Sequence, residues 1–137
     1  ACGKASADQS AAREQGCVRM EPCMREIVRA DALHDLMKCD AEAPCNVDCV
    51  ESIGSRVTPS KEYVELERAC FATRACLPTL TACAFLRDRP AVRTYSDALL
   101  ARLRKCLGVS GCKDAAECLY DEVSKLDAKV RACNESK

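Results

Sequence analysis

The chain has 137 residues, 48% of them hydrophobic, with 21 basic and 21 acidic residues and thirteen cysteines. The balanced charge argues against a global attraction to nucleic acid or to an anionic membrane. No apolar run approaches the roughly 18 residues that a membrane-spanning helix needs. Because cytosolic thiols are kept reduced, so many cysteines predict a disulfide scaffold in an oxidising compartment: secreted, periplasmic or at the cell surface.

The first half of the chain predicts helices and no strand. Residues 4–16 are Ala-rich and form a weak first helix, and residues 24–39 carry an amphipathic pattern. A short helix over 46–53 is expected to stop at Gly54. Thr58 is a candidate N-cap with Pro59 at the first helical position. The helix that follows is expected to carry four apolar residues along one face: Tyr63, Leu66, Cys70 and Phe71.

The second half predicts three more helical segments. One follows Pro78 and ends before Pro90. The next opens at Thr94, which forms a capping-box pattern with Asp97, and ends at Gly108. Residues 113–133 then carry one long apolar seam with alternating spacings of three and four.

These segments predict an all-α, disulfide-stapled antiparallel bundle of four to five helices, built as an array of helical hairpins. Residues 1–16 would be an N-terminal tether and weak first helix. Residues 17–133 would form the cysteine-rich bundle, and residues 134–137 the C-terminal tail.

Five pairs of neighbouring cysteines are six residues apart. On a continuous helix, six residues turn through about 600°, so the two side chains would lie roughly 120° apart. Such a gap suits a corner between helices, where each cysteine bonds across the bundle.

Folding the segments up and down divides twelve cysteines between the two ends of the bundle. Three disulfides are expected at each end, with the pairs within each set undetermined. The first set is Cys17, Cys23, Cys70, Cys76, Cys83 and Cys133. The second set is Cys39, Cys45, Cys49, Cys106, Cys112 and Cys118. A bridge between the two sets would contradict this division.

The thirteenth cysteine, Cys2, lies in the sequence Ala1-Cys2-Gly3 and is followed by a polar stretch. These three residues resemble the end of a bacterial lipobox, in which a small residue precedes the acylated cysteine. Ala1 still precedes Cys2, whereas a processed lipoprotein begins with its cysteine. The resemblance implies a lipid on Cys2 as the means of membrane attachment. The alternatives are that Cys2 is bridged and another cysteine is free, or that it pairs between chains.

A different function class is a thiolate store for a soft metal. The copper storage proteins are small four-helix bundles lined with cysteine, and this chain is similar to them in size and cysteine number. The resemblance implies Cu(I) bound by thiolates. The chain has no Cys-x-x-Cys, and Cys45–Cys49 is its one Cys-x-x-x-Cys. Entry ligands for Cu(I) would then be Met20, Met24, Met37 and His34.

The sequence gives little support for zinc binding or for catalysis by histidine. A zinc site at Cys39, Cys45 and Cys49 lacks the usual paired short spacings. His34 is the single histidine, and a lone histidine on a helix is more often a surface residue than a catalyst. We therefore assign no catalytic residue, no metal ligand and no cofactor, and expect no enzyme activity.

Charge is unevenly spread along the chain. Residues 40–51 are acidic without a base, and residues 87–105 are mostly basic. Both patches either solubilise and pair within the fold or form a docking surface for a protein partner or a second copy. We expect a non-catalytic structural or protein-interaction module, a candidate lipoprotein, that binds no nucleic acid.

Overall fold

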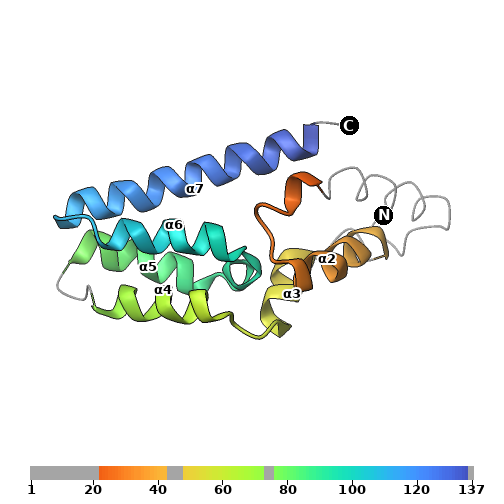
Figure 1. Cartoon of the computed structure of the whole chain (residues 1–137), viewed down its shortest axis with the longest axis horizontal. Helices are drawn as coiled ribbons and strands as arrows, with labels where there is room; N and C mark the ends of the chain where they lie inside the picture. The colour runs from red at the N-terminus through yellow and green to blue at the C-terminus, as the bar shows by residue number, and fades with distance from the viewer. Residues whose placement is uncertain (1–21, 43–47, 73–75, 136–137) are drawn as a thin grey trace.

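The computed structural model describes residues 22–42, 48–72 and 76–135 (Figure 1). It confirms an all-α, disulfide-rich fold, with no strand among these residues. They contain six α-helices, one more than the upper limit predicted, and one 3-10 helix. The helices are α2 (Ala30–Glu42), α3 (Cys49–Arg56), α4 (Lys61–Ala72), α5 (Leu77–Asp88), η1 (Pro90–Thr94), α6 (Asp97–Leu107) and α7 (Cys112–Glu135).

Serine and aspartate side chains set the starts of three helices. The Asp48 carboxylate accepts a hydrogen bond from the Glu51 amide at the start of α3. Ser60, rather than Thr58, caps α4, because its hydroxyl accepts the Tyr63 amide at 3.2 Å. Ser96, rather than Thr94, caps α6. Each cap satisfies an amide that has no partner within its own helix.

Residues 25–29 are not helical, although the pattern predicted a helix over 24–39. The backbone here pairs with the segment before α6 instead. The Arg29 amide donates to the Thr94 carbonyl, and the Ser96 amide donates to the Ile27 carbonyl. These long-range hydrogen bonds replace the helical ones, so α2 begins only at Ala30.

Gly54 does not end α3 as predicted; the helix continues to Arg56. Gly54 is buried, and the Pro90 carbonyl of η1 packs directly against its α-carbon, where a side chain has no room. Gly54 therefore allows η1 to pack closely against α3, and it does not end the helix.

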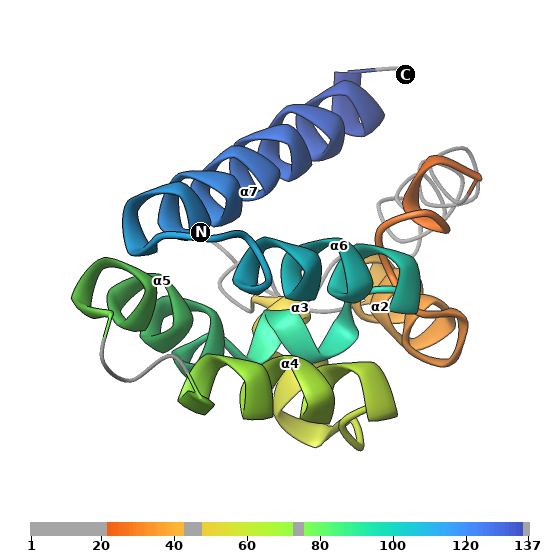
Figure 2. The same ribbon diagram turned by 60° about the vertical axis from the view of Figure 1, so that its left-hand side comes forward.

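Two core clusters share the long helix α7 (Figures 1 and 2). The first lies among α4, α5, α6 and the first half of α7, where it includes Leu100 and Leu119. The second joins α2, α3, Leu99 and the last part of α7, where it includes Leu126 and Cys133. In Figure 1, α7 runs along the molecule from the α4–α6 end toward the α2–α3 end.

Five disulfides connect the described cysteines. They are Cys23–Cys133, Cys39–Cys49, Cys70–Cys83, Cys76–Cys112 and Cys106–Cys118. Cys2, Cys17 and Cys45 lie outside the described residues.

The predicted division of the cysteines into two end sets is wrong at one bridge. Four bridges stay within the sets, but Cys76–Cys112 joins them. The reason is the reversal of the chain at η1, which sends α6 back toward the end of the molecule where α5 begins (Figure 1). The start of α7 therefore lies beside the start of α5, with the α-carbons of Cys76 and Cys112 5.4 Å apart.

The six-residue spacing has two structural meanings. Between Cys106 and Cys112 it spans the corner from α6 to α7, which contains Gly111 at φ 95°. Between Cys112 and Cys118 it lies within α7 itself. These two cysteines do not share a face and bond to different partners, Cys76 and Cys106.

Candidate functional site

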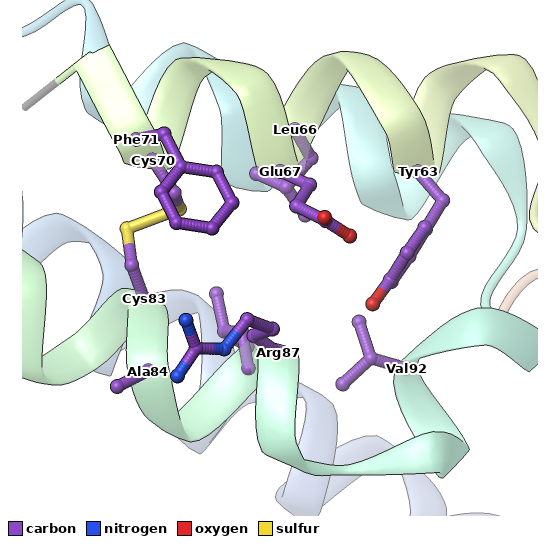
Figure 3. A pocket seen from close by; sticks show the side chains of 10 residues that line it. Tyr63, Leu66, Glu67, Cys70, Phe71, Cys83, Ala84, Arg87 and Val92 are labelled. Carbon is purple, nitrogen blue, oxygen red and sulfur yellow. A yellow bond between two sulfur atoms is a disulfide. The ribbon is translucent and has the colours of Figure 1, made fainter.

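A hollow of about 330 Å³ opens between α4 and α5 (Figure 3). One wall is α4; the other is α5 with Val92 of η1. Most of the lining is apolar, and three polar side chains contribute to it. The lining residues are Tyr63, Leu66, Glu67, Cys70, Phe71, Cys83, Ala84, Leu86, Arg87 and Val92.

A short covalent link joins the two helices at one end of the hollow. The Cys70–Cys83 disulfide joins α4 to α5, with the α-carbons 5.6 Å apart. Leu66 and Leu86 are buried in the core cluster beneath the hollow. Ala84 and the disulfide are short side chains, so the wall near them leaves space that larger residues would fill.

Two arginines of the α5–η1 wall stack on aromatic rings of α4. The Arg87 guanidinium lies 5.9 Å from the centroid of Phe71, and the Arg93 guanidinium lies 5.8 Å from that of Tyr63. Cation–π contacts of this kind hold both rings and both cations in place. Tyr63 is buried, whereas Phe71 is 38% exposed at the edge of the hollow.

Glu67 and Arg87 bring opposite charges to the hollow from its two walls (Figure 3). The two side chains form no ion pair with each other among the described residues. The Arg87 Nε instead lies 3.1 Å from Asp88, its neighbour on α5, in an exposed pair of little energetic weight. The hollow thus presents one anion and one cation above an apolar floor.

Next to the hollow, α4 carries an exposed apolar strip. Val64 is 46% exposed and lies seven residues before Phe71, so both occupy the same side of α4. We call these two residues the α4 strip. The sequence pattern grouped Phe71 with the buried face, but its packing leaves the ring at the surface.

All the cysteines that the structure describes form bridges. Ten of the thirteen are disulfide-bonded, and a disulfide sulfur cannot serve as a thiolate ligand. Cys39 and Cys49 of the zinc hypothesis are bridged to each other. Among the described residues, no cluster of three or more His, Cys, Asp or Glu side chains is placed to hold a metal ion.

Among the candidate entry ligands for copper, His34 and Met37 line one shallow hollow beside α2. Met24 and Met37 pack against the second core cluster, and His34 is exposed on α2. Met20 lies outside the described residues.

Several residues of the basic segment 87–105 pair within the fold. Arg104 of α6 reaches α4, where it lies 3.2 Å from both Glu62 and Glu65. Arg102 lies 3.8 Å from Glu122 of α7. These pairs favour the interpretation that this charge stabilises helix packing, and they leave Arg87 as the member of the segment that faces the hollow.

Comparison of the chain with known protein families, characterised proteins and solved structures found no match. Within the described part of the chain, none of the helices has the length and apolar character needed to cross a bilayer. The disulfides indicate an oxidising, extracellular type of environment.

Proposed function

We propose that this protein is a rigid, non-catalytic module of an oxidising compartment that acts by binding another protein. The observation that carries the proposal is the distribution of the bridges. Every described α-helix carries at least one disulfide-bonded cysteine or begins directly after one. Such cross-linking favours a fixed surface, which binds with a smaller loss of conformational entropy than a mobile one.

The α4 strip supports protein binding as the mode of action. Val64 and Phe71 are large apolar residues exposed on one side of a helix that a disulfide links to α5. Aromatic and arginine side chains are enriched among the residues that dominate protein interfaces, and Phe71 with Arg87 forms such a pair here. A partner protein with an apolar surface would cover both residues.

A lipid on Cys2 would tether the module to a membrane surface and leave the helices free to present the α4 strip. This part of the proposal comes from the three-residue resemblance to a lipobox. The mass of the protein purified from its native host tests it, because an acylated Cys2 carries added lipid mass that reduction does not remove.

The interaction is tested with a surface variant, Val64→Asp with Phe71→Asp, immobilised beside the wild type. The control is Tyr120→Asp, which changes a 52% exposed residue on α7, on the opposite side of the bundle from α4 (Figure 2). Extracytoplasmic protein from the native host is passed over all three after circular dichroism shows equal folding.

We expect a partner that the wild type and the control both retain and that the α4 variant loses. Equal retention by all three proteins, or retention by none, would overturn the role of the α4 strip.

A further inference from the structure

We propose that the hollow between α4 and α5 binds a free apolar amino acid, with the ligand carboxylate on Arg87 and its ammonium group on Glu67. The site borders the α4 strip, because Phe71 belongs to both, but ligand binding does not depend on a protein partner. The inference rests on the volume, the lining and the two charges of the hollow.

The volume favours a compact ligand. At about 330 Å³ the hollow lies at the lower end of ligand pockets, which span roughly 300–1,000 Å³. Leu66, Leu86 and Val92 with the Cys70–Cys83 disulfide form an apolar floor. A branched or aromatic side chain of a single amino acid suits this floor, whereas a larger ligand would protrude.

The two charges favour a ligand that carries both signs. A guanidinium pairs with a carboxylate through parallel N–H donors. The Nε of Arg87 is engaged by Asp88, while its terminal nitrogens have no partner among the described residues. Glu67 likewise has no ion pair there, and it accepts the N–H groups of an ammonium ion. A ligand with a single charge would leave one of these groups facing it unpaired.

The cation is already positioned before any ligand arrives. Stacking on Phe71 holds the Arg87 guanidinium at the edge of the hollow, and the disulfide fixes the separation of the two walls. A preorganised site loses less conformational entropy on binding.

The test titrates the full-length, oxidised protein with L-leucine in a calorimeter. Two leucine analogues lack one charge each: 4-methylpentanoate has only the carboxylate and isopentylamine only the ammonium. We expect leucine to bind about tenfold more tightly than either, the usual effect of losing one charged hydrogen-bonded contact.

Variants assign each charge to its residue. In Arg87→Gln, leucine should bind no more tightly than isopentylamine, which lacks the carboxylate. In Glu67→Gln, leucine should bind no more tightly than 4-methylpentanoate, which lacks the ammonium group. Arg87 is exposed, Glu67 is half-buried, and neither belongs to the core clusters, so these variants are expected to fold. Ala84→Phe fills the hollow and should weaken leucine binding at least tenfold, whereas the distant Tyr120→Asp should not change it.

Three outcomes would overturn the proposal: no heat of binding for leucine or phenylalanine at millimolar concentration, equal binding of leucine and 4-methylpentanoate, or unchanged binding in Ala84→Phe. The first outcome would show that the protein binds no apolar amino acid. The second would show that the ligand does not need an ammonium group, and the third that leucine binds outside the hollow. None of them bears on partner retention through the α4 strip, so the two proposals fail separately.

Discussion

Cys23 and Cys133 are bridged across 110 residues of sequence, with their α-carbons 5.8 Å apart. Lys129 forms an ion pair with Glu26 one helical turn earlier on α7. Together these contacts hold the segment before α2 against the last turns of α7, where Cys133 is fully buried. The second core cluster is therefore closed by a link between the two distant parts of the chain.

Removing this link should cost more stability than removing a short-range one. Cys23→Ala with Cys133→Ala opens a loop of 110 residues, whereas Cys70→Ala with Cys83→Ala opens one of 13. The chain-entropy model gives a difference of about 1–2 kcal/mol in the free energy of unfolding. Urea denaturation of both double variants measures it. A larger loss in the second variant would show that packing, not loop length, sets the contribution of each bridge.

The thiol count of the native protein tests the bridges directly. Ten described cysteines are paired, so alkylation under denaturing conditions without reductant should leave at least ten of the thirteen unmodified. Mass spectrometry before and after reduction counts them, and the reduced sample serves as the control. More than three alkylated thiols in the unreduced sample would contradict the bridges and make a titration with Cu(I) the next experiment.

Peptide mapping of the oxidised protein tests the bridge that the sequence reasoning did not anticipate. A proteolytic fragment that joins Cys76 to Cys112 should be present and should separate on reduction. The Cys106–Cys118 fragment serves as an internal control, because it joins neighbouring helices within one predicted set. A Cys76 linked to another cysteine of the first set would restore the original division.

Gly54→Ala should destabilise the fold strongly, although it adds only one methyl group. The added β-carbon would collide with the backbone carbonyl of Pro90, so η1 must move away from α3. Overpacking of this kind costs about 1–3 kcal/mol in the free energy of unfolding. Gly108→Ala is the matched control, because its β-carbon would lie 3.5 Å from the nearest atom, an ordinary contact. Equal denaturation midpoints for the two variants would show that α3 and η1 are not in close contact.

Tyr95 should make the protein sensitive to alkali. Burial raises the pKa of its phenol above 10.0, and the Asp127 carboxylate adds to the effect. As the pH rises past about 10, the unfolded chain loses this proton first, so the free energy of unfolding falls until the folded-state pKa is reached. Below about pH 9 both states keep the proton and the contribution is fully present.

Tyr95→Phe removes the phenol and should make unfolding less dependent on pH above about 10. Urea denaturation at several pH values compares the two proteins, and about pH 8 supplies the baseline where the phenol stays protonated in both states. Tyr95 is partly buried and packs against both core clusters, so identical alkaline slopes would mean that this packing does not shield the phenol.

Much of the fold follows from local sequence patterns. The apolar seam of residues 113–133 predicted α7 to within two residues at each end, because an amphipathic stripe of that length has one way to bury itself. Gly108 and Pro90 marked helix ends through backbone restrictions that act within one turn. The start of α2 was misplaced, because the bonds that unwind residues 25–29 come from Thr94 and Ser96, far along the chain.

The hollow could not be read from the sequence. Phe71 and Tyr63 fall on the same predicted face, yet one ring is exposed and the other buried. The difference depends on tertiary packing, because Tyr63 lies in the first core cluster and Phe71 lies at its edge. In the sequence, Arg87 is one of several basic residues in the segment 87–105. Only packing distinguishes it, because Arg102 and Arg104 pair with glutamates of other helices.

By itself the sequence determined the compartment type, the helical class and the presence of a disulfide framework, because cysteine density and apolar periodicity are local quantities. Only the tertiary structure decided which cysteines meet. The reversal at η1 placed Cys76 beside Cys112, and pairing depends on the distance between α-carbons in space rather than along the chain.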